Sequence, residues 1–503
     1  MAIEVSEDLI RAVTTKDKAL SDGRTLVKKG AFKSIFRTGD NSLLWGQCQG
    51  SGSKPYELSI DLAGDTPTIR CSCPVKPPPC KHTLGLLVCF LEQATKFQEG
   101  EPPAELLEKR AKNVGRAEKR AESAAKPSEA NLGAQKKKAE AQRAAIDDLL
   151  EPLLLDAVKS GLGTIDAKRA SRLVEQARQL HDAYLPGAAE RLRRIAALAK
   201  SRSSDDGDDD VYYQLREPGD ELPDELRHRL IARHVTRLWA MVRKGRKYLD
   251  DKLEEGESQG DADAVVEELL GRVWKLDELK HGGHAKQSLQ LFELAYERFD
   301  DHVREERIEQ SWLLDLEEGS IYVDRTFRPL DRLDKMKEGE SFEKPLLLSE
   351  AAVYPGFVNR RVRWELSARK SRNVELTDFE RIHARALPSL DVAVAKLKEQ
   401  IKNPLAPDEA VVLVRASEVR KVEGGLALVD AKGARLSLRD SPLARYRALG
   451  NFEMAVGAAI DESGALEQPA SVLLRLYVGL ADEAIHAQPL SLVVGTRHVR
   501  VGM

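Results

Sequence analysis

The chain has 503 residues, too many for one compact domain, and a prior of about 150 residues per domain predicts roughly three. Its 79 basic and 82 acidic side chains leave a net charge of −3, which argues against a protein that coats nucleic acid or anionic lipid along its whole length. Charged residues make up 32% of the chain and aromatic residues 5%, so much of it is expected to be exposed helix.

A membrane-spanning helix needs ~18 consecutive apolar residues, and no stretch of this sequence approaches that length. Near Met1 the sequence carries acidic residues where a secretion signal would need an apolar run. We therefore expect a soluble, cytoplasmic protein with no membrane partner.

Residues 1–100 are expected to form an N-terminal module. Its charge is 13 basic minus 11 acidic residues, a net of +2. A basic cluster near the start consists of Lys28, Lys29, Lys33 and Arg37. With so small an excess of positive charge we favour a solvated surface over a nucleic-acid contact for this cluster.

Two short strands and a helix are expected in the second half of this module. Tyr56–Leu62 alternates apolar and polar side chains, as a half-buried strand does, and Thr68–Cys73 can form a second strand. Gly64–Pro67 supplies turn residues between them. The continuous apolar stretch that follows His82 predicts a helix packed on this hairpin.

Three of the five cysteines fall in the segment CSCPVKPPPCKH, which runs from Cys71 to His82. The C-x-C-x6-C-x-H pattern supplies three thiols and one imidazole, ligand types that Zn²⁺ prefers in a tetrahedral site. In each C-x-C or C-x-H step, alternate residues can point to the same side of the backbone. Four prolines among the six intervening residues stiffen the loop and reduce the entropy lost when an ion closes it. The pattern therefore predicts a zinc site.

This spacing, with a proline after the second cysteine and Lys81 between the third and fourth ligands, resembles the SWIM-type zinc finger. The resemblance covers roughly residues 54–93 and implies a β-hairpin with two ligands followed by a helix that begins near the other two. Trp45–Tyr56 also resembles the lead-in of bacterial SWIM proteins, and Val353–Phe357 with Arg361–Trp364 does so more loosely. Such proteins are often encoded beside MoxR-type AAA ATPases and von Willebrand A-type proteins, which implies a protein partner of the MoxR-type ATPase system.

The resemblance implies one zinc ion and four ligands, which are Cys71, Cys73, Cys80 and His82. Three thiolates would give the site a formal charge of −1, which Lys76 and Lys81 would offset. Four protein ligands leave no position for water, so the zinc is predicted to be structural and not catalytic. Cys48 and Cys89 are expected to be buried as small apolar residues in a strand and in the helix.

Residues 101–143 are rich in Ala, Lys, Arg and Glu, and are expected to be a linker that is disordered or a fluctuating helix. Lys109–Arg143 carries 11 basic and 4 acidic residues, a net of +7, and includes Lys136–Lys138. We favour a spacer. A contact with nucleic acid or an acidic protein is the alternative.

The middle of the chain is expected to be helical. Apolar residues at helical spacing predict helical domains at 144–200 and 226–310, the latter including a helix with Leu289, Leu291, Leu294 and Ala295 on one side. Residues 201–225 are expected to be an acidic hinge, since Asp205–Asp210 lacks the spacing of an EF-hand calcium loop. His281–His284 is expected to be a glycine turn and not a metal site.

Residues 311–503 predict an α+β region. Short strands are expected at 320–323, 345–348, 362–364, 410–414, 425–429, 435–438, 472–480 and 490–501. A helix is expected over Asp378–Lys402. A small barrel and a sandwich both remain open.

No nucleotide-binding or metalloprotease motif is present: the sequence has no G-x-x-x-x-G-K-[ST], G-x-G-x-x-G or H-E-x-x-H. Gly256–Gly260 matches G-x-S-x-G, but the charged residues before it cannot form the central strand of a nucleophile elbow. We therefore expect no enzyme. The predicted protein is α+β and multidomain, with a zinc-stapled ββα module, a helical middle and an α+β C-terminal region. We expect a protein-interaction module, with DNA binding through the finger and the basic linker as the alternative.

Overall fold

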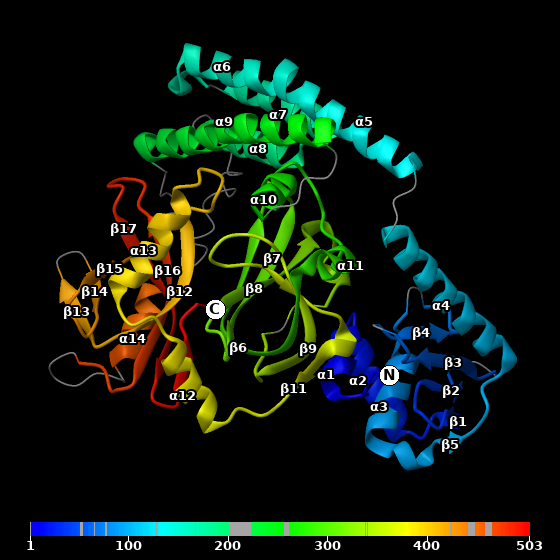
Figure 1. Ribbon diagram of the computed structural model, residues 1–503. Helices are drawn as coiled ribbons and strands as arrows, with labels where there is room; N and C mark the ends of the chain where they lie inside the picture. The colour runs from blue at the N-terminus through cyan, green and yellow to red at the C-terminus, as the bar shows by residue number, and fades with distance from the viewer. Residues whose placement is uncertain are drawn as a thin grey trace.

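The computed structural model describes residues 2–50, 54–64, 66–75, 78–125, 129–165, 167–200, 223–255, 261–337, 339, 341–422, 425–440, 448–457 and 465–502. Within them the chain forms an N-terminal module, a helical bundle, a β-barrel and a C-terminal sheet with flanking helices (Figure 1). The predicted α+β class is confirmed. None of the described helices combines the length and apolar character that a membrane span requires.

The N-terminal module packs helices against a five-stranded sheet of order β4-β3-β2-β1-β5. Its elements are α1 (Glu7–Val13), α2 (Asp17–Lys28), β1 (Phe32–Arg37), β2 (Leu43–Cys48), β3 (Tyr56–Asp61), β4 (Thr68–Cys71), α3 (Lys81–Gln93), the 3-10 turn η1 (Ala94–Lys96) and β5 (Gln98–Glu99). The predicted hairpin is the antiparallel pair β3–β4, in which Leu58 lies opposite Cys71. Alternate β3 side chains, Leu58 and Ile60, are buried in the core shared with α3.

Helices α2 and α3 cross at a contact between two glycines. An added Cβ at Gly23 would lie 2.9 Å from the Gly85 nitrogen and 2.9 Å from the Lys81 oxygen. A Cβ at Gly85 would lie 2.7 Å from the Phe32 ring. The two backbones can therefore approach this closely only because neither position carries a side chain.

The bundle lies across the top of Figure 1 and is reached from the module through α4 (Ala104–Ala125). Its elements are α5 (Glu129–Ala145), the π-helical turn η2 (Ile146–Leu150), α6 (Glu151–Ser160), the 3-10 turn η3 (Leu162–Thr164), α7 (Ala167–Asp182), α8 (Pro186–Lys200), α9 (Asp224–Glu255) and α10 (Asp261–Leu269). Its core includes Leu150, Leu180, Leu192 and Leu238, all fully buried.

Much of the segment expected as a linker, 101–143, is helical. The last turns of α5 are part of the bundle, because Ala139 is buried in its core and Gln142 Nε2 donates to the carbonyls of Tyr184 and Leu270 at 2.7 and 2.8 Å. Helices α5, η2 and α6 follow one another without a break in helical backbone. Pro152 has no amide hydrogen to donate, and the wider π turn just before it accommodates the lost bond.

The barrel is built from β6 (Ala285–Asp301), β7 (Glu306–Asp315), β8 (Ile321–Pro329), β9 (Leu346–Val353), β10 (Val362–Arg363) and β11 (Arg369–Ser371). Short elements beside these strands are α11 (Leu276–Leu279), the turn η4 (Lys280–His284), η5 (Leu330–Lys335) and η6 (Leu366–Ala368). The strand order is β10-β9-β6-β7-β8, with β11 on β9. A bridge between Val323 and Arg361 joins β8 to the chain entering β10 and closes the barrel.

The helix expected around Leu289–Ala295 is wrong, since these residues lie in strand β6. A bulge between Glu293 and Ala295 shifts the alternation of β6 by one residue, which imitates helical spacing. Both faces of the strand are also buried: Leu291 faces the barrel core and Leu294 faces the C-terminal sheet. A strand covered on both faces loses the apolar–polar alternation by which strands are usually identified.

The C-terminal sheet has the order β12-β16-β17-β15-β14-β13, with β18 on β17. Its elements are α12 (Leu376–Arg385), α13 (Leu390–Ile401), β12 (Glu409–Arg415), β13 (Glu418–Val422), β14 (Gly425–Val429), β15 (Arg435–Leu438), α14 (Leu449–Gly457), β16 (Ala470–Val478), β17 (Ile485–Val494) and β18 (Arg497–Arg500). Helices α13 and α14 cover one face, where Leu397 and Phe452 are buried.

A single helix over Asp378–Lys402 is wrong, because this segment is divided between α12 and α13. Pro388 has no amide hydrogen and disfavours helical backbone at the residue before it. Leu387 is accordingly extended, and its amide donates to the Leu413 carbonyl at 2.8 Å.

The other face of the C-terminal sheet packs on the outside of the barrel. Leu413 and Leu473 from the sheet share one buried cluster with Trp312 and Leu314 from the barrel. Within this interface Arg475 of β16 binds the Glu297 carboxylate of β6 at 2.6 and 2.7 Å. The barrel and the sheet are therefore joined by apolar packing and by a buried ion pair.

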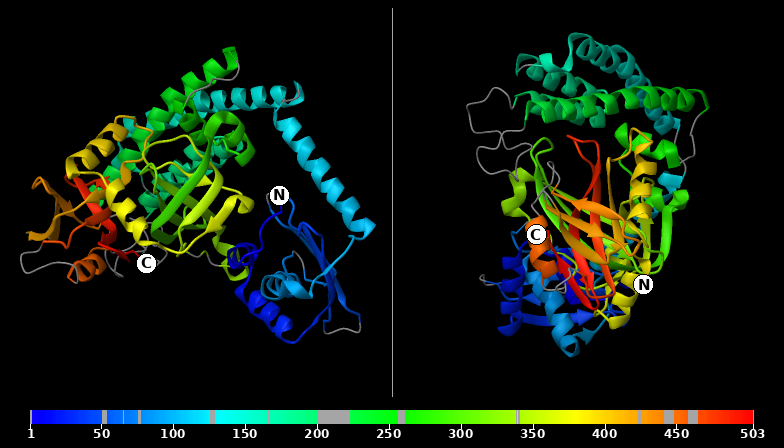
Figure 2. Two further views of the ribbon diagram at one scale, coloured as in Figure 1. Left: turned by 60° about the horizontal axis from the view of Figure 1, so that its bottom comes forward. Right: turned by 90° about the vertical axis from the view of Figure 1, so that its left-hand side faces the viewer.

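The bundle also contacts the C-terminal region. Arg233 and Arg237 of α9 lie 2.6 and 2.8 Å from the Asp408 carboxylate, just before β12. Lys244 donates to Asn403 Oδ1 at 2.7 Å. In the right view of Figure 2, α9 is the long green helix that runs across the top, above the C-terminal sheet.

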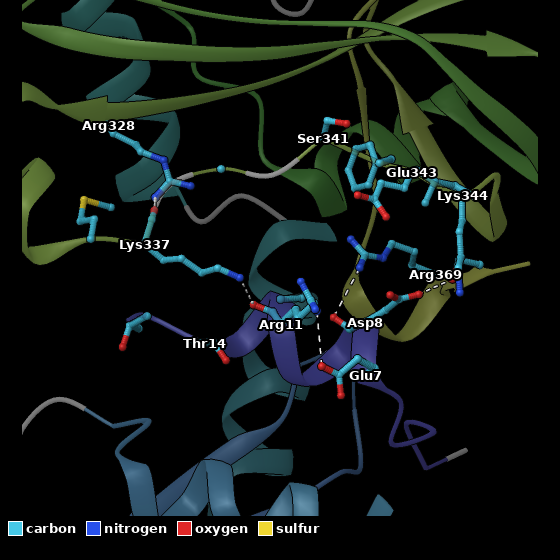
Figure 3. A pocket seen from close by; sticks show the side chains of 17 residues that line it. Glu7, Asp8, Arg11, Thr14, Arg328, Lys337, Ser341, Glu343, Lys344 and Arg369 are labelled. Atoms are coloured by element: carbon cyan, nitrogen blue, oxygen red, sulfur yellow. Dashed lines mark hydrogen bonds and ion pairs between the residues drawn. The ribbon is translucent and has the colours of Figure 1, made fainter. Parts of the chain in front are cut away.

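Helix α1 of the N-terminal module lies beside the barrel, across a cavity of about 980 Å³ (Figure 3). Asp8 accepts a hydrogen bond from Ser371, and Lys337 Nζ donates to the Arg11 carbonyl at 3.4 Å. Leu366 adds an apolar contact with the core of the module. The walls carry both signs of charge, with three carboxylates, Glu7, Asp8 and Glu343, and five Lys and Arg side chains. The module thus contacts the barrel through a largely polar boundary.

Candidate metal centre

The structure brings the four predicted ligands together at one end of the β3–β4 hairpin. Cys71 ends strand β4, and Cys73 lies two residues further on, after Ser72, whose amide donates to the Glu57 carbonyl of β3 at 3.0 Å. Cys80 is the N-cap residue of α3 and His82 lies in the first turn of that helix. The hairpin therefore supplies two donors and the helix supplies the other two.

The donor atoms lie at distances that suit one tetrahedral metal ion. The three Sγ atoms and one imidazole nitrogen are all within 4.8 Å of one another. His82 Nδ1 lies 3.6 Å from Cys80 Sγ and 3.9 Å from Cys71 Sγ. Zn–S bonds of ~2.3 Å and Zn–N bonds of ~2.0 Å in a tetrahedron would separate such donors by roughly 3.5–3.8 Å. This group could hold a metal ion, and its composition is consistent with zinc.

The four side chains are shielded from solvent. Cys71, Cys73, Cys80 and His82 are 8%, 1%, 3% and 4% exposed. The ring of Tyr56 covers His82, with ring centroids 4.8 Å apart. Four protein donors would fill the tetrahedral positions of one ion and leave no free coordination position for water.

Hydrogen bonds prepare the thiols for ligation. The Cys71 thiol donates to Cys80, which lowers the pKa of Cys80 and raises the pKa of Cys71. The Cys73 amide donates to Cys71 Sγ at 3.4 Å, and the Cys80 amide donates to Thr83 Oγ1 at 3.0 Å. Cys80 also lies at the positive end of the α3 dipole. One thiolate is thus favoured before an ion binds, and bound metal would ionise the remaining thiols.

Cys48 and Cys89 lie outside this group. Both are buried in the core of the module, at 0% and 2% exposure, and burial raises the pKa of each thiol, to about 11 in Cys48. Thiols held in the neutral form are poor metal ligands. Their side chains pack as small apolar residues.

The charges expected around the site are only partly available to an ion or a partner. Lys81 is exposed at the start of α3, whereas Lys76 lies outside the described residues. In the N-terminal basic cluster, Lys28, Lys29 and Lys33 are exposed. Arg37 instead donates to Asn41 at 2.7 Å and lies 3.8 Å from Glu99.

Other sequence features receive no site from the structure. Asp205–Asp210 and Gly256–Gly260 lie outside the described residues. His281–His284 forms a turn in which Gly283 has a φ of 81°, a value that favours glycine. In the part of the chain that the structure describes, Cys71, Cys73, Cys80 and His82 are the one group found that could hold a metal ion.

Sequence reasoning missed the supports of the site, Tyr56 over His82 and the Gly23–Gly85 crossing that places α3. Two glycines 62 positions apart give no local signal, although an isolated glycine in an apolar helical stretch, such as Gly85, does suggest a close approach.

Comparison with known proteins supports the SWIM resemblance from a second part of the chain. Residues 137–217 match the SWIM-associated four-helix bundle domain, and the described part of that range forms the end of α5 and α6, α7 and α8. No curated protein and no solved structure matches the chain. The match covers the bundle and not the Cys/His cluster, so the two observations are independent. The chain therefore carries a SWIM-associated domain together with a possible Cys3His metal site.

Proposed function

We propose that the chain is a zinc-binding SWIM-type protein whose finger serves as a protein-interaction module. The observation that carries this proposal is the meeting of three thiols and one imidazole within 4.8 Å of one another, in a chain that also contains a SWIM-associated bundle. The ion would be Zn²⁺, held by Cys71, Cys73, Cys80 and His82, and would fix α3 on the hairpin. It would supply a rigid surface and no reaction, so we propose no enzymatic role.

Charge favours a protein partner over DNA. The module carries a net charge of only +2, and Arg37 of its basic cluster is engaged by Asn41 and Glu99. A surface that binds DNA through phosphates needs several free cations, because each neutralised phosphate contributes to affinity. Within the described residues of the cluster, Lys28, Lys29 and Lys33 remain exposed. DNA binding through these lysines and the basic segment 109–143 is the second candidate.

The resemblance to bacterial SWIM proteins suggests a MoxR-type AAA ATPase system as the partner. This suggestion rests on gene neighbourhood among similar proteins and not on a contact in the structure. It makes a MoxR-type ATPase the first protein to test.

Elemental analysis tests the metal. We expect about one zinc per chain in the wild type, because four donors close one tetrahedral site. Cys80→Ala and His82→Ala should lose the ion, whereas Cys89→Ala, a buried cysteine of the same helix, should keep it. A full zinc content in Cys80→Ala would contradict the ligand assignment.

A capture experiment tests the interaction. Immobilised wild-type protein should retain a specific partner at about 0.15 M salt, where exposed charges are screened beyond ~8 Å. Cys80→Ala should lose that partner and Cys89→Ala should keep it. Fluorescence anisotropy with single- and double-stranded DNA is the opposing test. DNA binding that persists at this salt, with no zinc-dependent protein partner, would replace the proposal with the DNA-binding function.

A further inference from the structure

A second charged site lies in the bundle, away from the finger. A cavity of about 290 Å³ opens between α5, the end of α9, α10 and the segment leading to α11. The charged side chains on its walls are Lys138, Lys252, Arg272, Lys275, Glu267 and Glu278. Four cations against two carboxylates leave an excess of two positive charges.

Glu267 organises the inner wall. This carboxylate is 8% exposed and accepts hydrogen bonds from Tyr248 and Arg272. Lys252 Nζ lies 3.6 Å from Glu267 and donates to the Tyr248 hydroxyl at 3.1 Å. One buried carboxylate is therefore shared by two cations and one hydroxyl, which holds these groups in fixed positions.

On the outer wall a second carboxylate is again shared by two cations. Glu278 lies 3.8 Å from Arg272 and 3.6 Å from Lys275. Across the cavity Lys138 stands 5.6 Å above the Tyr184 ring and, among the described residues, has no carboxylate within ion-pair distance. An added anion on the open side would thus meet Lys138, and Lys275, which shares the Glu278 carboxylate with Arg272.

Lys138 belongs to the most basic part of the sequence. Lys136 and Lys137 precede it on α5, within one helical turn, and both are exposed. Beside the cavity Val273 is 84% exposed. The site therefore combines a small cationic cavity, two further exposed cations and an exposed apolar side chain.

We propose that this cavity binds a carboxylate of an acidic segment in a partner protein, with neighbouring acidic residues on Lys136 and Lys137 and an apolar residue on Val273. The inference rests on the proposed protein-interaction function and names the chemistry of one partner surface. A carboxylate fits because the cavity walls carry four cations and two carboxylates, and Lys275 shares its one carboxylate, Glu278, with Arg272. A nucleic-acid backbone is less suited, because its phosphates are read along an extended cationic face and not in a small cavity.

Anisotropy of labelled hexaglutamate with the full-length, zinc-loaded protein tests the proposal. Hexaglutamate should bind at about 0.15 M salt and hexaglutamine should not. Lys138→Gln should weaken hexaglutamate binding about threefold, and Lys138→Gln with Lys275→Gln about tenfold, as partly exposed ion pairs allow. Both substitutions leave Glu267 and its partners in place. Lys159→Gln, an exposed lysine at the end of α6, is the matched control and should bind as the wild type does.

Three results would overturn the proposal. The first is that the double variant and Lys159→Gln bind hexaglutamate with equal affinity. The second is that the wild type binds hexaglutamine as tightly as hexaglutamate. The third is that an oligonucleotide displaces hexaglutamate and binds the same lysines more tightly. Cys80→Ala separates this site from the finger, since it should keep hexaglutamate binding. Loss of peptide binding with zinc-dependent partner capture intact would refute the cavity alone. Retained peptide binding without zinc-dependent capture would refute the proposed function of the finger.

Discussion

Glu297 and Arg475 meet between the barrel and the C-terminal sheet, and Glu297→Gln tests what their ion pair contributes. The Glu297 side chain is 0% exposed and that of Arg475 is 4% exposed. Glu297 also accepts hydrogen bonds from Gln310 and Trp312 at 2.6 and 2.5 Å. The substitution keeps the shape of the side chain but removes the negative charge to which Arg475, Gln310 and Trp312 all donate hydrogen bonds.

The expected loss is large because the arginine stays buried and keeps only the partly exposed Glu409 carboxylate, 3.6 Å away, as a counter-ion. Removal of one partner from a buried ion pair costs about 3–5 kcal/mol, a substantial part of the ~5–15 kcal/mol that stabilises a domain. Arg475→Met added to Glu297→Gln removes the stranded charge, so the double variant should be more stable than the single variant. Glu318→Gln is the control. The Glu318 side chain, which pairs with Lys286, is more than half exposed, so this ion pair should contribute at most ~1 kcal/mol to stability.

Hydrogen–deuterium exchange followed by mass spectrometry suits this test, because a chain of several units does not unfold in one two-state transition. Faster exchange is expected in β6, β7 and β16, with no change in the N-terminal module. A decrease of less than about 1 kcal/mol in the free energy of opening of those strands would refute the reasoning. So would a double variant less stable than the single one.

Three further predictions concern other parts of the molecule. Gly23→Ala should destabilise the N-terminal module by about 1–3 kcal/mol, because the new Cβ would collide with backbone atoms of α3. Gly115→Ala in α4, where no atom lies near the added Cβ, should be neutral or stabilising. Thermal unfolding followed by circular dichroism compares the two variants. Burial raises the pKa of Asp324 to about 6 from 3.8, so the native state binds more protons than the unfolded state between pH 4 and 6 and stability falls as the pH rises through that window. Asp324→Asn should therefore match the wild type near pH 4 and exceed it at pH 7, and a pH-independent difference in melting temperature would contradict this. Metal removal by a chelator should speed amide exchange in β4 and the first turn of α3 while leaving the barrel unchanged, and protection that survives chelation would argue against a metal-stapled module.

The finger was predictable because its signals are local. The ligand pattern spans Cys71–His82, and the flanking alternation and apolar run predict β3, β4 and α3 close to their observed positions. Most short C-terminal strands also follow from apolar runs between turn residues. These features depend on neighbours within a few positions, which the sequence displays directly.

Features that depend on distant partners were not predictable. Strand β6 resembles a helix in sequence because a bulge and two buried faces remove its alternation. Glu297 and Arg475 are separated by 178 positions, and neither residue stands out among the many charged residues of the chain. The charge of Lys138 is evident in the sequence, but the cavity beside it requires Lys252 from α9 and Arg272 from the segment between α10 and α11.

The double burial of strand β6 has a consequence for how this protein can be divided. Its Leu294 side fits Leu413 and Leu473 of the C-terminal sheet, and β18 returns to it, with His498 donating to the Leu294 carbonyl at 2.9 Å. A gene fragment that ends between Ser371 and Glu409 would express a barrel whose outer wall is an uncovered apolar surface, prone to aggregation. The barrel and the C-terminal sheet must therefore be expressed, and must evolve, as one unit. A truncation after α4 would instead separate the N-terminal module from the barrel mainly at the polar boundary beside α1.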